Sequence, residues 1–276
     1  GNYSGGVYTI SGNPTESGTF NYTVSTLGNC ASSDQSGTII IHPDTTISDP
    51  DNKNQTLCMN SPIDSIDFAI TNGTGANVSG LPAGLTGSYS GGIYTISGNP
   101  TESGTFNYTV NSEGACVQAS ETGTITINPN TTISNPGNNN QTICINNAVT
   151  PIAFTVTNGT GANVSGLPLG VSGNYSGGVY TISGNPTESG TFNYVVSTSG
   201  NCLQTTASGT ITVNTDDTIS APTNNVQTVC SNTPISSILY TVGGGATGAS
   251  ISWDVQPTGI TGSYSGGIFT ISGTPT

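Results

Sequence analysis

The sequence carries very little charge. Only 5% of its 276 residues are Asp, Glu, Lys or Arg, and Lys53 is the single basic residue apart from His42. A chain with one lysine and no arginine cannot neutralise a row of phosphates, which argues against binding to nucleic acid or to anionic lipid surfaces. The net charge of −13 comes from 14 acidic residues spread along the chain rather than from an acidic tail.

Long apolar runs are also absent. No stretch approaches the roughly 18 apolar residues that a membrane-spanning helix needs, so we predict no membrane span in this sequence. Ile, Val, Tyr and Phe instead recur at alternating positions, which disordered polar segments do not show. In the segment 105–110 (TFNYTV), Phe106, Tyr108 and Val110 face one way and polar residues face the other. This alternation predicts antiparallel strands with one buried face.

The dominant feature is an internal repeat of 86 residues. The segment 3–22 recurs almost unchanged at 89–108 and 175–194, and a fourth copy starts at Tyr264 with an offset of 89. An active site is not built in triplicate with near-identical sequence. Copies this similar indicate recent tandem duplication, which mainly adds length.

Segments rich in Pro, Asn, Asp and Gly set the limits of the repeats. The clearest are 42–54, 128–140 and 214–225. We expect the sequence to be a section of a longer array. The predicted divisions are the C-terminal part of an Ig-like repeat at 1–43, full repeats at 44–129 and 130–215, and the N-terminal part of a repeat at 216–276.

Turn residues punctuate each repeat every 8–12 positions, which divides it into about seven short strands. About seven short alternating strands in 86 residues fit an Ig-like β-sandwich. No segment has an apolar stripe with helical spacing, and a β-solenoid normally has a much shorter period. The predicted fold class is all-β: tandem Ig-like β-sandwich repeats that form an elongated rod or filament.

Six cysteines follow the same 86-residue step and suggest disulfides in an oxidising compartment. One periodic pairing, Cys58–Cys116 and Cys144–Cys202, lies inside the repeats. The other, Cys30–Cys58, Cys116–Cys144 and Cys202–Cys230, crosses the linkers. Loop entropy gives about 4 kcal/mol for either pairing and does not choose between them. The linker between Cys30 and Cys58 favours the bonds inside the repeats, which leaves Cys30 and Cys230 to pair outside the sequence.

A resemblance to a known family rests on three motifs. They are GLPAGL at Gly80–Leu85, TISGNPT at Thr95–Thr101 and SGTFNYTV at Ser103–Val110. This pattern resembles the Ig-like repeats of large bacterial surface proteins. The cysteine phases and the GTITI ending look like the versions in giant secreted proteins of Bacteroidota, which include gliding-motility adhesins. The resemblance covers essentially the whole chain and implies an Ig-like sandwich, export and surface attachment, without catalysis.

Metal-binding and catalytic candidates are few. Asp44, Asp49 and Asp51 cluster at one linker and form a weak candidate Ca²⁺ site, although the next repeat loses their charge. Zinc is not expected, because there is one histidine and the cysteines are better used in disulfides. A Ser-His-Asp triad would have to use His42, which has no counterpart in the other repeats. We therefore predict no enzyme activity, no resident metal and no cofactor.

Two features of the sequence bear on carbohydrate. The resemblance to Bacteroidota proteins suggests O-glycans at short Asp-Ser/Thr-apolar sequences, and the acceptors that it implies are Thr45, Ser65 and Thr218. Separately, a tyrosine recurs beside a Gly-Gly turn in every copy. Each of these tyrosines either forms a platform for a sugar or packs over its own turn; they are Tyr3, Tyr89, Tyr175 and Tyr264.

These observations predict a structural or adhesive extracellular repeat array, acting as a stalk or filament of a large bacterial cell-surface protein. The expected partners are neighbouring repeats of the same chain, together with other fibre chains or surface glycans. Two alternatives stay open. The repeats are glycan- or cell-surface-binding modules, or they are spacers in a larger secreted enzyme.

Overall fold

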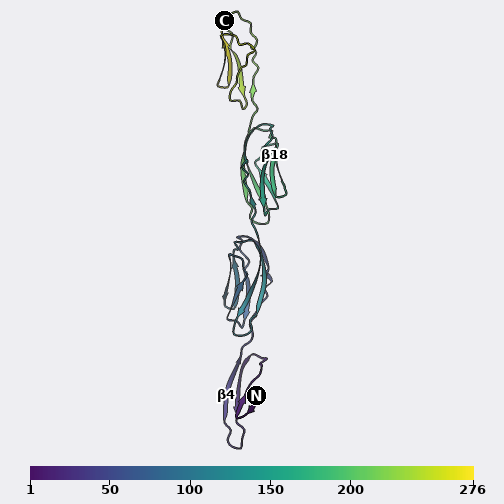
Figure 1. The fold of residues 1–276 in the computed structure, drawn as a ribbon, viewed down its shortest axis with the longest axis vertical. Helices are drawn as coiled ribbons and strands as arrows, with labels where there is room; N and C mark the ends of the chain where they lie inside the picture. The colour runs from purple at the N-terminus through teal and green to yellow at the C-terminus, as the bar shows by residue number, and fades with distance from the viewer. The chain divides into compact units, whose positions relative to one another are not determined.

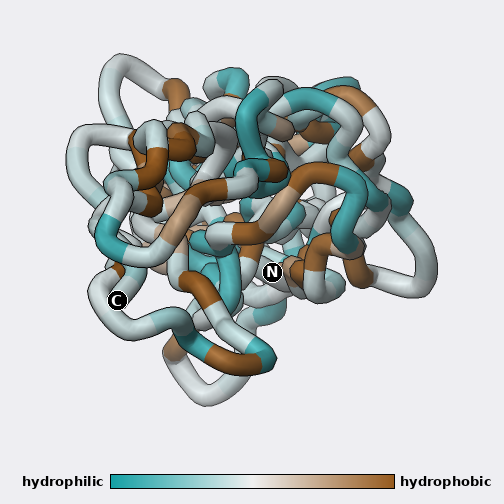
Figure 2. The backbone as a smooth tube through the Cα atoms, turned by 90° about the horizontal axis from the view of Figure 1, so that it is seen from above, coloured by the Kyte–Doolittle hydropathy of each residue, from teal (hydrophilic) through white to brown (hydrophobic).

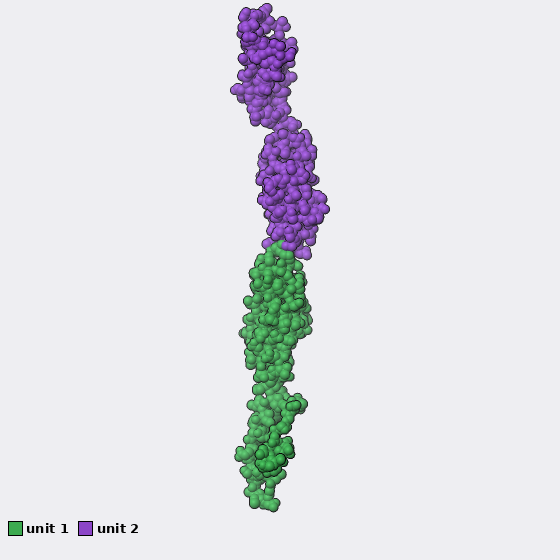
Figure 3. Space-filling model, in the orientation of Figure 1, with its two compact units in different colours: residues 1–130 green, residues 131–276 purple.

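The structure, a computed structural model, describes all residues from 1 to 276. The chain divides into two compact units, 1–130 and 131–276 (Figure 3). Its regular structure is made of β-strands, and the only helical element is a single 3-10 turn, η1 (Asp51–Lys53). No helix in the chain is long and apolar enough to cross a membrane. Each unit contains one complete two-sheet sandwich and one partial repeat (Figure 1).

The complete sandwich of the first unit has two four-stranded sheets. Strands are antiparallel to their neighbours except for β6 and β12, which run parallel. The first sheet has the order β5 (Thr46–Ile47), β7 (Ile66–Thr71), β10 (Ile93–Gly98) and β9 (Leu85–Ser90). The second has the order β6 (Gln55–Cys58), β12 (Ser120–Asn128), β11 (Gly104–Glu113) and β8 (Gly75–Ser79).

The complete sandwich of the second unit repeats this plan strand for strand. Its one parallel pair is β14 with β20. The first sheet has the order β13 (Thr132–Ile133), β15 (Ile152–Thr157), β18 (Val179–Gly184) and β17 (Val171–Ser176). The second has the order β14 (Asn140–Cys144), β20 (Thr206–Asn214), β19 (Gly190–Ser199) and β16 (Gly161–Ser165).

The partial repeats contain only some of these strands. In the first unit, β1 (Asn2–Ser4) pairs with β2 (Val7–Thr9), and β3 (Gly18–Ser25) pairs with β4 (Asp34–Ile41). In the second unit, one sheet has the order β21 (Thr218–Ile219), β22 (Ile238–Gly243), β24 (Ile268–Gly273) and β23 (Ile260–Ser265). Side chains are less buried where fewer strands pack together. Ile39 is 41% exposed, whereas Ile125, at the same position of the complete sandwich, is fully buried.

The core follows directly from the alternation in the sequence. Ile66, Phe68 and Ile70 of β7 are buried, while the residues between them are exposed. The same positions of β15 are buried in the second unit. Apolar segments are accordingly short and interrupted by neutral or hydrophilic ones along the chain (Figure 2). The prediction of strands with one buried face is confirmed.

A repeated glutamine fixes the place where the chain crosses from the first sheet to the second. The Gln55 side-chain amide donates to the carbonyl oxygens of Asn52 and Asp64, at 3.1 and 2.7 Å, and its oxygen accepts from the Asp64 N–H at 3.1 Å. Gln141 and Gln227 make the corresponding bonds in their own repeats. This clamp holds the start of β6 against the segment that leads into β7.

The chain enters and leaves each complete sandwich at opposite ends. In the first unit, the N–H of Thr45 donates to Val117 O, at the tip of the β11–β12 hairpin, at 3.0 Å. The strand β12 then runs the length of the sandwich to Asn128, whose carbonyl accepts from Met59 N–H at 3.0 Å. In the second unit, Thr131 N–H binds Leu203 O at the corresponding hairpin tip.

Candidate functional sites

The cysteines of one sandwich lie at its two ends. Cys58 ends β6 and is in register with Asn128, the last residue of β12, whereas Cys116 lies in the hairpin loop before Ser120, the first residue of that strand. Eight steps along β12 separate these ends by roughly 26 Å. A disulfide needs Cα atoms within about 7 Å of each other. The predicted bond Cys58–Cys116 is therefore wrong.

The same geometry excludes the predicted bond Cys144–Cys202. Cys144 is in register with Asn214 at the end of β20, and Cys202 lies in the hairpin loop before that strand. Four of the six cysteines are free thiols in the structure. Those four are Cys30, Cys116, Cys144 and Cys230. Neither of the two periodic pairings derived from the sequence is formed.

The suggested O-glycan acceptors lie in different surroundings. Thr45 is only 4% exposed, and its hydroxyl lies 2.6 Å from Ser112 Oγ and donates to Val117 O at 3.0 Å. The fold therefore does not present this hydroxyl for modification, and glycosylation of Thr45 is an untested prediction. Ser65 and Thr218 are exposed, and both remain predictions.

The three aspartates at the first linker do not converge on one point. The Asp44 carboxylate accepts from Val117 N–H at 3.3 Å, while Asp49 forms an ion pair with Lys53. Hydrogen bonding to Asp49 raises the pKa of Lys53, and Glu121 Oε2, 3.3 Å from its Nζ, adds to this effect. No group of three or more His, Cys, Asp or Glu residues in the chain is placed to hold a metal ion. The weak Ca²⁺ candidate of Asp44, Asp49 and Asp51 is not assembled.

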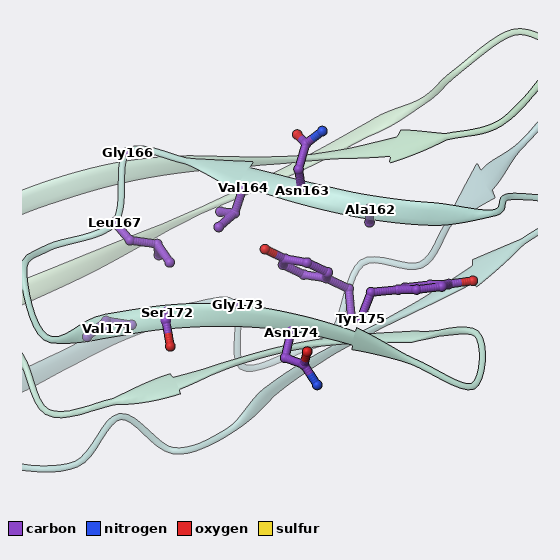
Figure 4. A pocket seen from close by; sticks show the side chains of 11 residues that line it. Ala162, Asn163, Val164, Gly166, Leu167, Val171, Ser172, Gly173, Asn174 and Tyr175 are labelled. Carbon is purple, nitrogen blue, oxygen red and sulfur yellow. The ribbon is translucent and has the colours of Figure 1, made fainter.

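An open groove of about 600 Å³ lies between the edge strands β16 and β17. Val164, Leu167 and Tyr175 project into it, whereas Asn163 and Asn174 point away (Figure 4). The Tyr175 hydroxyl donates to the carbonyl oxygen of Gly159 at 3.4 Å, and its ring packs against the core. Tyr175, like Tyr89 at the equivalent position of the first unit, therefore packs against the core of its own sandwich.

Two buried tyrosines have the largest shifts in acidity. Burial raises the pKa of Tyr108 to about 12, and the nearby Glu121 carboxylate contributes in the same direction. Burial also raises the pKa of Tyr194 to about 12. Each hydroxyl donates to a backbone carbonyl, Lys53 O or Asn139 O, at 2.8 Å. Because the two tyrosines occupy the same position in successive repeats, their role is structural.

Comparison with solved structures identifies the fold. The chain is similar to the I-band fragment I67–I69 of titin, with a TM-score of 0.58 and 7% sequence identity, covering 81% of this chain and 86% of that one. An E-to-A variant of titin I67–I69, described as a three-Ig structure, matches with a TM-score of 0.58 and 7% identity, covering 80% and 85%. No family model and no curated protein matches the sequence. The predicted fold class of tandem Ig-like β-sandwich repeats is confirmed.

Proposed function

We propose that the chain is part of an extracellular structural array, serving as a stalk or filament of a large bacterial cell-surface protein. The observation that carries this proposal is that the chain enters and leaves each complete sandwich at opposite ends. A domain with this connectivity adds its own length to the protein at each repetition. Domains with both termini at one end would instead fold back on one another.

The near-identity of the repeats supports a spacer role. The buried positions of the second core are those of the first, displaced by 86 residues, with side chains of the same kind. The acidic turn residues are also used structurally, since Glu102 accepts from Ala83 N–H at 2.7 Å and Glu188 accepts from Leu169 N–H at 2.9 Å. We therefore propose that the array has no catalytic activity of its own.

An extracellular location is supported by the surface chemistry. Lys53 is the only cleavage site for a trypsin-like protease in 276 residues, and its side chain is held by Asp49 and Glu121. Two of the cysteines are disulfide-bonded, which is typical of proteins in oxidising compartments. The resemblance to Bacteroidota surface repeats points the same way. We propose in addition that the array is adhesive and that it is related to gliding-motility adhesins.

Small-angle X-ray scattering of the 276-residue chain tests the spacer role. A compact protein of this size has a radius of gyration of about 19 Å. If each 86-residue repeat contributes about 40 Å, the 276 residues extend over about 130 Å, and the radius of gyration is about 37 Å. A value close to that of a compact particle would overturn the proposal.

Location and binding need separate measurements. Antibodies against residues 44–215 should label intact cells and decorate fibres, and labelling only after lysis would contradict the extracellular assignment. Binding of the chain to a glycan array would favour the alternative of a glycan-binding module. An enzyme domain found elsewhere in the same polypeptide would favour the alternative of spacer repeats in a secreted enzyme.

A further inference from the structure

The strand β17 forms a free edge of the first sheet in the second complete sandwich. It joins β18 through a two-residue glycine turn, 177–178, in which φ is +56° and +82°. In a hairpin of this type the flanking residues, Ser176 and Val179, exchange hydrogen bonds, so every second residue of β17 points its backbone N–H and C=O away from β18. Gly173 and Tyr175 are the central residues that point outward.

This edge has none of the features that usually prevent pairing with another strand. Proteins protect edge strands with charged residues, proline, bulges or very short length. The sequence of β17, VSGNYS, contains no charged residue and no proline, and all six residues pair with β18 without a bulge. It is also the longest edge strand of its sandwich, since β13, β14 and β16 have 2, 5 and 5 residues.

The groove beside β17 adds apolar surface to this edge. Val164, Leu167 and Tyr175 project into the groove, and a strand added to β17 would extend the first sheet along this open side and withdraw part of these side chains from water (Figure 4). No acidic residue lines the groove, although the chain has a net charge of −13. Two copies can therefore approach here without bringing carboxylates together.

We propose that β17 pairs antiparallel with β17 of a second copy of this chain, about a two-fold axis. Val171 N–H is already bound to Pro168 O at 3.2 Å, whereas Gly173 and Tyr175 make no other backbone hydrogen bond on the free side. In the register that uses both residues, Gly173 of each copy lies opposite Tyr175 of the other, and Asn174 lies opposite itself. This pairing is self-complementary, as a two-fold contact between identical chains requires.

The same edge recurs in the other repeats. The edge strands β9 and β23 have the sequences LTGSYS and ITGSYS, and each precedes a Gly-Gly turn with positive φ. Stable complexes use about 20–30 residues from each partner, and one edge supplies six. A single pairing is therefore weak, whereas copies that pair through several repeats gain avidity. The proposal rests on the structural role proposed above, because a stalk or filament presents many copies at one surface.

Self-association of the purified 276-residue chain tests the pairing. We expect analytical ultracentrifugation between about 1 μM and 1 mM to show reversible dimers. Hydrogen exchange should show the N–H groups of Gly173 and Tyr175 becoming protected as the concentration rises. The N–H of Asn174, which faces β18, should be protected at every concentration. A chain that stays monomeric, or a dimer in which Gly173 and Tyr175 exchange freely, overturns the proposal.

Added charge tests the register. The edge variant has lysine at the self-opposed position of three edge strands: Ser88→Lys, Asn174→Lys and Ser263→Lys. The control variant has lysine at exposed positions of strands inside the same sheets: Ala69→Lys, Thr155→Lys and Thr241→Lys. Like charges face each other across the proposed pairs only in the edge variant, so its dissociation constant should rise about tenfold or more while that of the control changes little. Equal dissociation constants for the two variants overturn the pairing.

A variant with glutamate at the same edge positions supplies the complement. Alone, it should associate as weakly as the lysine edge variant. An equimolar mixture of the two should associate at least as tightly as the parent chain, because each lysine then faces a glutamate. Restored association also shows that both variants are folded. A mixture that remains monomeric overturns the proposed register.

The outcomes separate this pairing from the role of the array. An extended particle in dilute small-angle scattering that never self-associates would overturn the strand pairing and leave the array role in place. A compact particle in dilute solution would overturn the array role whether or not the chains associate. Protection of Gly173 and Tyr175 that appears only after another surface component is added would overturn a second copy as the partner.

Discussion

The hydroxyl of Tyr108 donates a 2.8 Å hydrogen bond to the backbone carbonyl of Lys53 and so ties β11 to the segment that leads into β6. Tyr194 makes the same bond, at the same distance, to Asn139 O. Lysine and asparagine are interchangeable at this position because the bond uses the backbone. Each tyrosine ring also packs edge-on against a core phenylalanine, Phe68 or Phe154, at 6.3 Å between ring centroids.

Replacing Tyr194 by Phe should weaken the second sandwich while leaving its core filled. The variant keeps the ring but leaves the Asn139 carbonyl without this donor, which costs about 1–2 kcal/mol in the free energy of unfolding. Chemical denaturation followed by circular dichroism measures this cost. Tyr175→Phe is the matched control, since its bond to Gly159 O is long at 3.4 Å. An equal effect of both substitutions would contradict the assigned role of Tyr194.

The raised pKa values of Tyr108 and Tyr194 predict a loss of stability in alkali. Below the unfolded pKa of about 10, both hydroxyls are neutral in the folded and the unfolded chain, so their ionisation does not lower the free energy of unfolding at those pH values. Between about pH 10 and 12 the unfolded chain loses these protons while the folded chain keeps them, which favours unfolding by about 2 kcal/mol for each tyrosine.

This alkaline transition should be visible as cooperative ionisation. Phenolate absorbance should rise together with the loss of circular dichroism, because the buried hydroxyls ionise on unfolding. In the Tyr108→Phe and Tyr194→Phe double variant, the pH dependence of the unfolding free energy should become shallower. An unchanged slope in that variant would show that other groups control the alkaline transition.

Because the Thr45 hydroxyl is buried and hydrogen-bonded, we expect its removal to lower the stability of the sandwich. Its hydroxyl joins Ser112 and Val117 O at the end of the sandwich, so Thr45→Val should lower the free energy of unfolding by about 1–3 kcal/mol. Ser65→Ala, at an exposed position, should change it by less than about 0.5 kcal/mol. Glycopeptide mapping of the native protein should find no sugar on Thr45, and a sugar there would contradict the folded geometry.

The sequence was sufficient to predict the fold because alternation and turn spacing are local properties. Ile66, Phe68 and Ile70 alternate with exposed residues, and this pattern recurs 86 residues later. Burial of one face is the physical consequence of that pattern in any two-sheet packing. The core could therefore be assigned residue by residue without knowing the order of the strands.

The cysteine pairing and the burial of Thr45 could not be predicted from these local patterns. A repeat period gives the phase of Cys58 and Cys116 but not the end of the sandwich at which each lies. That depends on β6 crossing to the second sheet and pairing in parallel with β12. Likewise, a polar Asp-Thr-Thr segment looks solvated in sequence, whereas the hairpin tip at Val117 covers Thr45 in the fold.

Glycines that look equivalent in the sequence differ in the space around them in the fold. Gly166 has φ of +84°, and a Cβ there would meet the carbonyl oxygen of Asn193 and lie 3.2 Å from Tyr194 Cα. These backbone atoms belong to β19 and cannot move without disturbing its pairing with β16. We expect Gly166→Ala to cost about 3 kcal/mol or more in the free energy of unfolding.

Gly177 is the matched control in the same repeat. Its φ is +56°, and nothing lies within 4 Å of the position that a Cβ would take, so Gly177→Ala meets only the left-handed backbone cost of about 1 kcal/mol. Both variants remove a glycine and add a methyl group, which cancels their similar effects on the unfolded chain. In denaturant unfolding, the free energy of unfolding of Gly166→Ala should therefore be well below that of Gly177→Ala. Similar stabilities would mean that β16 and β19 do not approach as closely in solution as this geometry requires.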